Sequence, residues 1–153
     1  MPKFFRKKQL YYIIILILVG FILRVFFILR FGVRESPDAL LYSNIALNFL
    51  QGKGFIQTIR PYEFITPPLY PLFLSFIYLI FGKENYLAAV IIQSLFGAST
   101  CVLIYLIGRK IFNTGVGILS SLYFAIYPIS IWWNSFFLTE TIYTFFLVFL
   151  FGI

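Results

Sequence analysis

Long apolar runs separated by shorter polar stretches are the main pattern of this 153-residue chain. The first run extends from Tyr11 to Leu29, and as a helix it would be roughly 29 Å long, enough to cross the hydrocarbon core of a bilayer. It is too long for a signal peptide, and no small-residue cleavage site follows it. We therefore predict a first transmembrane helix over residues 10–29, preceded by a basic cytoplasmic tail over residues 1–9.

Three more runs predict the rest of the membrane domain. One ends just before Arg109 and Lys110, and another ends at Trp132 and Trp133, a pair that suits the membrane interface. The last run is about 22 Å long by helix rise and has no closing basic residues, so we expect an incomplete span in a fragmentary chain. The predicted segments are transmembrane helices over 85–108, 115–133 and 140–153, a cytoplasmic loop over 109–114 and an external turn over 134–139.

The apolar stretch at residues 67–82 is predicted not to cross the membrane. A helix from Pro68 to Phe81 would be about 21 Å long, which is short of a bilayer core of about 30 Å. If it crossed, Arg109 and Lys110 would lie on the outer face, against the preference of basic residues for the cytoplasm. We therefore expect it to lie along the outer interface, inside an external loop over residues 30–84.

The same external loop opens with the signals of a helix start. Ser36 can cap a helix, Pro37 suits the first helical position, and Asp38 lies in the first turn. Apolar residues then recur at helical spacing, which predicts an amphipathic helix on the membrane over about 37–51, with a second interfacial helix over about 68–81. The predicted fold is an all-α integral membrane protein with three full transmembrane helices, the start of a fourth, and this long external first loop.

The composition and charge of the chain also indicate that most of it is surrounded by lipid. Hydrophobic residues make up 61% of it and charged residues only 11%, whereas a soluble domain is about a quarter charged. Under the predicted topology, six basic residues and no acid face the cytoplasm, and all five carboxylates face outward. The net charge of +7 is therefore a signal of topology and requires no nucleic-acid partner.

Two features of the composition narrow the chemistry. The chain has no histidine, which excludes Ser-His-Asp and Cys-His catalysis and imidazole metal sites. Cys101 is the single cysteine, which excludes an intrachain disulfide and a thiolate cluster. Any acid, base or metal ligand must come from the five carboxylates, or from tyrosine, lysine and backbone groups.

The outward-facing acids are the first candidates for function. Asp38 lies next to Tyr42 in a helix first turn, whose backbone N–H groups favour the ionised acid. Glu140, in LTET, lies near membrane depth, where a charge is costly and therefore a candidate site. Both acids can equally be ordinary helix-start residues. Glu63, near Arg60, can equally form a solvated ion pair in the loop.

Arg24 is a charged residue inside the first predicted span. By helix rise it lies roughly 9 Å from the outer end of that span, so its side chain could extend to the interface. It could equally line a cavity and meet an anionic phosphate. The sequence leaves both alternatives open.

The order of these features resembles the GT-C membrane glycosyltransferases. The resemblance rests on a basic cytoplasmic start, one span, and the segments SPDALLYSNIALNFLQGKGF, TPPLYPLFLSFIYLIFG, GRKIF and LTETIY. It is closest to the branch of the lipid A aminoarabinose transferase and the protein O-mannosyltransferase-like enzymes, and it covers what would be their N-terminal portion. Members of that branch use polyprenyl-phosphate sugars at the outer face of the membrane.

The resemblance implies a role for each candidate acid. Asp38 matches the first-loop acid at the catalytic centre, which acts as a general base or belongs to an acceptor or metal site. Glu140 matches the acid at the outer start of the fourth span, which lines the same cavity, and PPLYP places Glu63 beside it. In this branch a second acid often follows the loop acid, but here Ala39 follows Asp38, which weakens a paired-carboxylate metal site.

A sugar transfer from a lipid phosphate needs a base for the acceptor hydroxyl and cations near the leaving phosphate. Asp38 is the candidate base, Arg24, Arg60 or Lys53 could face the phosphate, and Tyr42 is expected to contact substrate. A divalent cation held by Asp38 and Glu140 would need oxygen ligands alone, and the cofactor is otherwise unknown.

The expected function is therefore a glycosyltransferase of the cell (plasma) membrane that moves a sugar from a polyprenyl-phosphate donor to an acceptor hydroxyl or phosphate at the outer face. Its expected partners are the lipid-linked donor and membrane lipids. The alternative is a small, non-catalytic membrane protein or transporter-related subunit. The sequence specifies neither the sugar, the lipid carrier and the acceptor nor the oligomeric state.

Overall fold

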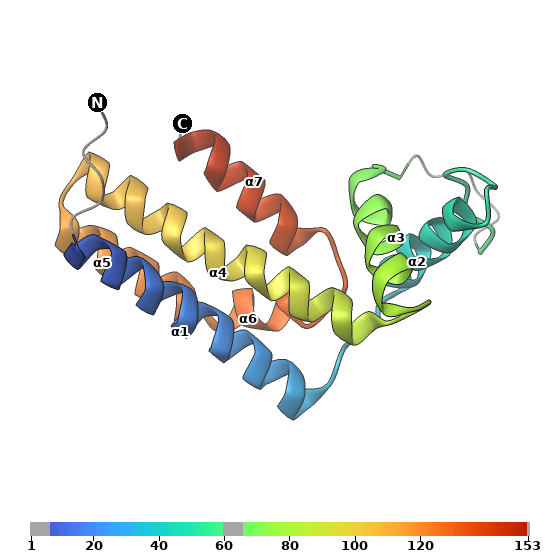
Figure 1. Cartoon of the computed structure of the whole chain (residues 1–153), viewed down its shortest axis with the longest axis horizontal. Helices are drawn as coiled ribbons and strands as arrows, with labels where there is room; N and C mark the ends of the chain where they lie inside the picture. The colour runs from blue at the N-terminus through green and yellow to red at the C-terminus, as the bar shows by residue number, and fades with distance from the viewer. Residues whose placement is uncertain (1–6, 60–65, 153) are drawn as a thin grey trace.

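The structure is a computed structural model that describes residues 7–59 and 66–152, and the described residues form seven helices and no strand. Figure 1 shows α1, α4, α5 and α7 gathered at one side and α2 and α3 at the other. The helices are α1 (Lys7–Phe31), α2 (Pro37–Leu50), α3 (Leu69–Phe81), α4 (Tyr86–Ile111), α5 (Thr114–Ile126), α6 (Pro128–Asn134) and α7 (Glu140–Gly152).

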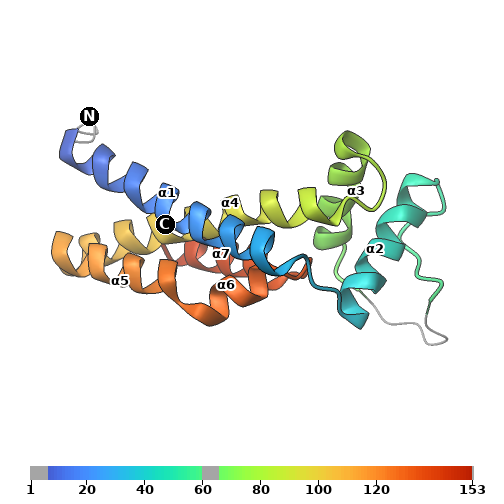
Figure 2. The same cartoon turned by 90° about the horizontal axis from the view of Figure 1, so that it is seen from below.

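Helix α4 is the centre of the bundle, because it packs against α1, α5 and α7. The start of α1 and the end of α4 lie at the same end of the bundle (Figure 1). Helices α2 and α3 lie beyond the opposite end, as the view from below also shows (Figure 2). The chain therefore makes its long excursion through α2 and α3 at the end of the bundle where α1 finishes and α4 begins.

Two of the described helices, α1 and α4, are long and apolar enough to cross a membrane. A third candidate span exists if α5 and α6 are counted together, but they are bent by 52° at their junction. The predicted single helix over 115–133 is therefore two helices in the structure. Pro128 explains the break, because it has no N–H to donate and its ring clashes with the preceding turn.

The start of α2 forms as its sequence predicts. The Ser36 side chain accepts a hydrogen bond from the backbone N–H of Ala39 at 3.1 Å, Pro37 begins the helix, and Asp38 lies in the first turn. Ala39 and Ala46 then turn inward, where α2 packs against α3. The cap thus fixes where α2 begins, and the two alanines mark the face that it buries.

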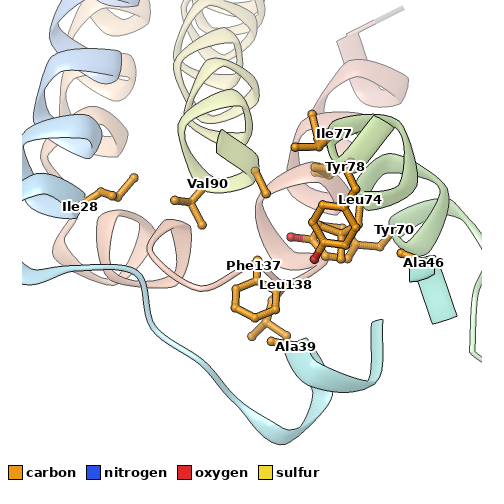
Figure 3. Close-up of a cluster of buried hydrophobic side chains, with 12 residues drawn as sticks. Ile28, Ala39, Ala46, Tyr70, Leu74, Ile77, Tyr78, Val90, Phe137 and Leu138 are labelled. Atoms are coloured by element: carbon orange, nitrogen blue, oxygen red, sulfur yellow. The ribbon is translucent and has the colours of Figure 1, made fainter. Parts of the chain in front are cut away.

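A cluster of buried side chains joins the α2–α3 pair to the bundle. Figure 3 shows side chains of α2 and α3 close to Phe137 and Leu138 of the α6–α7 connection, and Val90 of α4 belongs to the same cluster. The ring of Phe137 stacks on that of Tyr86, with centroids 4.3 Å apart and planes 4° from parallel. This cluster positions α2 beside the start of α7, where two of the candidate acids lie.

Candidate functional site

A cavity of about 200 Å³ opens between α1, α4, α5, α6 and α7. It brings together Arg24 from α1 and Glu140 from α7, which are 116 positions apart in the sequence. Much of the rest of its lining carries hydroxyl groups or aromatic rings. The other lining residues are Gly97, Thr100, Phe124, Tyr127, Ile129, Ser130, Trp133, Thr141 and Thr144.

Arg24 lines this cavity and does not extend to the interface, because only 1% of it is exposed. Its Nη1 donates to the carbonyl of Gly20 at 2.9 Å, and its Nη2 donates to Oγ of Ser130 at 3.0 Å. The guanidinium carbon lies 5.5 Å from the centre of the Phe124 ring, a cation–π distance. These contacts leave the buried Nε of Arg24 without a hydrogen-bond partner.

Gly97 makes room for the Arg24 side chain. A Cβ atom added at Gly97 would lie only 2.5 Å from Nε of Arg24 and 3.0 Å from its Cδ. The arginine therefore lies directly against the backbone of α4, an approach that a side chain at this position would block. The small residue and the buried cation form one local unit.

Glu140 is the first residue of α7 and is exposed at the cavity. Its backbone carbonyl accepts a hydrogen bond from the Thr144 hydroxyl at 2.7 Å. The N-terminus of a helix stabilises a nearby negative charge. Arg24 makes no ion pair with Glu140, so the two charges share a cavity without neutralising each other by direct contact.

The Tyr42 hydroxyl connects the two candidate acids electrostatically. Burial raises the pKa of Tyr42 above its ordinary value of 10, a hydrogen bond with Thr139 opposes that shift, and the charges of Asp38 and Glu140 raise it further. Asp38 itself is exposed in the first turn of α2. The phenol of Tyr42 is thus neutral at ordinary pH and able to donate a hydrogen bond close to both acids.

Tyr42 also lines a second cavity of about 270 Å³, which is mostly apolar. This cavity lies between the α2–α3 pair and α7, and Thr139 supplies a hydroxyl to it. Its other lining residues are Pro67, Leu69, Tyr70, Ile142, Tyr143 and Phe146. Tyr42 therefore borders this apolar cavity and is also close enough to both acids for their charges to act on its hydroxyl.

Not all of the predicted site residues gather at this place. Arg60 and Glu63 lie outside the described residues. Lys53 is exposed beyond the end of α2, and the helix separates it from Asp38 by roughly 18 Å of rise from Asp38 to Leu50. Within the described part of the chain, Arg24 is thus the predicted phosphate-binding cation that lines the cavity.

Few of the described side chains near the site could bind a metal ion. Within residues 7–59 and 66–152, no three or more acidic or thiol side chains gather closely enough to hold an ion. Asp38 and Glu140 would have to serve with substrate oxygens as the remaining ligands. We derive no step through a metal.

Three residues that lie in or beside the site were missed by the sequence analysis. Ser130 fixes the Arg24 guanidinium and Gly97 admits it, but neither type of residue is distinctive in an apolar run. Gln93 is fully buried in α4. A polar amide inside a predicted span is costly to bury, and this could have marked Gln93 as a candidate.

The comparison with protein families gives one match. A family described as dolichyl-phosphate-mannose-protein mannosyltransferase matches residues 66–151, more than half of the chain. The matched range contains Gln93 and Glu140, whereas Arg24, Asp38 and Tyr42 precede it. No curated protein and no solved structure matches the chain.

Proposed function

The chain belongs to the dolichyl-phosphate-mannose-protein mannosyltransferase family. From this membership we propose that it acts as a membrane glycosyltransferase. The reaction is the transfer of a sugar from a polyprenyl-phosphate donor to an acceptor hydroxyl or phosphate at the outer membrane face. The observation that carries the proposal is the shared cavity of Arg24 and Glu140, with Asp38 and Tyr42 close by.

The donor phosphate is assigned to Arg24. A buried guanidinium that lines the cavity carries the compensating charge, and its planar fork of N–H donors matches the geometry of phosphate oxygens. As the bond between the anomeric carbon and the phosphate oxygen breaks, negative charge accumulates on the leaving polyprenyl phosphate. Arg24 stabilises that charge, and the hydrogen bond to Ser130 holds the guanidinium in place.

Asp38 is assigned as the general base when the acceptor is a hydroxyl. The acceptor oxygen attacks the anomeric carbon, its proton passes to the Asp38 carboxylate, and polyprenyl phosphate leaves. Glu140 lines the cavity from the other side and orients the sugar or acceptor by accepting hydrogen bonds. Tyr42, neutral at working pH, donates a hydrogen bond to substrate between the two acids.

The proposed location is the cell membrane, with the N-terminus cytoplasmic and the reaction at the outer face. The basic residues before α1 and the pair Arg109 and Lys110 at the end of α4 support this orientation, because these two ends lie together in the bundle. Helices α2 and α3 then lie at the outer end. The PPLYP segment and the α2–α3 pair are proposed to rest on the outer surface of the bilayer.

The decisive test of the site is Asp38→Asn in the full-length protein, assayed with labelled polyprenyl-phosphate sugar. Loss of a general base lowers turnover by about 10²–10⁴-fold. We expect this loss with normal membrane insertion, measured by the amount of protein in the membrane fraction. Unchanged turnover would remove Asp38 from the mechanism, whereas a wild-type protein without transfer would contradict the proposed activity itself.

A further inference from the structure

The Gln93 side chain is completely buried in α4, and both ends of its amide are engaged. Its Oε1 accepts a hydrogen bond from the Tyr70 hydroxyl at 2.7 Å. Its Nε2 donates to the backbone carbonyl of Phe136 at 2.9 Å and to Oγ1 of Thr141 at 3.4 Å. One side chain therefore connects α3, α4, the α6–α7 connection and α7.

These hydrogen bonds form in a buried place, where the amide of Gln93 is shielded from water that could bond to it instead. A buried amide that loses its partners retains the full cost of its desolvation, so the bonded arrangement is strongly preferred over a loosened one. Burial raises the pKa of Tyr70 well above its ordinary value, so its hydroxyl stays protonated and remains a donor. Arg34 also holds the backbone of the α6–α7 connection, because its backbone N–H donates to the carbonyl of Ser135 at 2.9 Å.

The partners of Gln93 are neighbours of the proposed site, although Gln93 does not line its cavity. Thr141 lines the cavity and directly follows Glu140 in the sequence. The Tyr70 ring lies edge-on to the Tyr42 ring, with centroids 5.3 Å apart. The hydrogen bonds of Gln93 thus reach the start of α7 on one side and, through Tyr70, the α2 face that carries Tyr42 on the other.

We propose that Gln93 is a positioning residue that clamps the α2–α3 pair to the start of α7 and so fixes the separation of Asp38 and Glu140. This proposal rests on the proposed function, because it assigns the clamp to the same site. Gln93 acts through Tyr70 and Thr141 and touches no reacting atom.

The kinetic test compares Gln93→Leu with a control that removes a buried hydroxyl elsewhere. Misplacing reacting groups by about 1 Å costs up to roughly 10²-fold in rate, so we expect Gln93→Leu to lower kcat by about tenfold or more. The donor KM should change by less than about twofold, because Arg24 keeps its own partners. Tyr70→Phe and Thr141→Val, which each delete one hydroxyl, should lower kcat by smaller factors.

Ser75→Ala is the matched control. The Ser75 hydroxyl is buried and bonds to Pro71 at 2.7 Å and to Ala46 at 3.3 Å, so its bonds stay within the α2–α3 pair. This variant should keep the wild-type kcat. If Ser75→Ala lowers kcat as much as Gln93→Leu does, general loosening of the pair explains the effect and the clamp is overturned.

A distance measurement tests the clamp independently of activity. Spin labels at Phe76 on α3 and Leu150 on α7, both exposed, would be introduced in the full-length protein after Cys101→Ser. We expect a narrow distance distribution that broadens in Gln93→Leu and in Tyr70→Phe but not in Ser75→Ala. A distribution that stays narrow in Gln93→Leu overturns the proposal. Broadening in a protein that transfers no sugar would support the clamp and contradict the proposed function.

Discussion

Gly97→Ala is the substitution that most directly probes the buried cation. The added Cβ would lie 2.5 Å from Nε of Arg24, whereas ordinary van der Waals contacts begin at 3.4 Å. The arginine must therefore retreat by about 0.9 Å from a position in which it is 99% buried. A retreat of that size disturbs the hydrogen bonds of the guanidinium, which are 2.9 Å long to Gly20 and 3.0 Å long to Ser130.

The expected cost follows from these two effects. Overpacking of a buried position costs about 1–3 kcal/mol, and a hydrogen bond to a charged group contributes about 1.5–3 kcal/mol. Because relaxation relieves part of the clash, we expect a loss of about 2–3 kcal/mol in the free energy of unfolding. If Arg24 binds the donor phosphate, the displacement should also weaken binding of polyprenyl phosphate by about tenfold or more, equivalent to about 1.4 kcal/mol.

Two assays separate these effects. Both tryptophans of the chain, Trp132 and Trp133, lie on α6 beside Ser130, so their fluorescence during thermal unfolding in detergent reports on this region. Titration with polyprenyl phosphate measures binding. Gly115→Ala is the control, because an added Cβ there meets only the side-chain oxygen of Asn113 at 3.2 Å.

The double variant Gly97→Ala with Arg24→Ala tests the cause. Removing Cδ and Nε removes the clash, so Gly97→Ala should cost less stability in the Arg24→Ala background than in the wild type, while the double variant remains unable to bind the phosphate tightly. The reasoning would be refuted if Gly97→Ala were as stable as Gly115→Ala, or if the double variant bound the phosphate as well as the wild type.

Two further predictions concern topology and pH. In a background with Cys101→Ser, a cysteine introduced by Lys110→Cys should resist an impermeant thiol reagent added outside intact cells, whereas a cysteine introduced by Thr58→Cys should react. Labelling at position 110 would contradict the assigned orientation. Burial raises the pKa of Tyr70 and of Tyr78, so the unfolded chain, with tyrosines near 10, ionises first as the pH rises. The stability that these groups contribute is present below pH 10 and lost above it, so Tm should fall between about pH 10 and 11. The fall should be less steep in Tyr70→Phe, and an unchanged slope in that variant would exclude Tyr70 as a cause.

Local signals explain which parts of the fold could be predicted. The cap at Ser36 depends only on neighbouring residues, and the structure confirms it. The bend at Pro128 was not predicted, because hydropathy continues across it and proline is tolerated in membrane helices when other groups satisfy the backbone. Ser130 Oγ donates to the carbonyl of Tyr127 at 3.0 Å, a bond that the one-dimensional pattern does not reveal.

The candidate site shows the same limit. Helix rise alone left two orientations for Arg24, and the choice depends on Gly97, which lies 73 positions later in the chain. The hydrogen bonds of Gln93 likewise join residues separated by 23 to 48 positions. Such contacts arise from packing between helices, so a single sequence indicates the residues without indicating their partners.

The most direct measurement of the central claim follows both products of sugar transfer in the full-length protein. Membranes containing the protein would receive a polyprenyl-phosphate donor labelled in the sugar and in the lipid. The account predicts that labelled sugar appears on the acceptor in a one-to-one ratio with released polyprenyl phosphate. Release and transfer no greater than in membranes without the protein would contradict it.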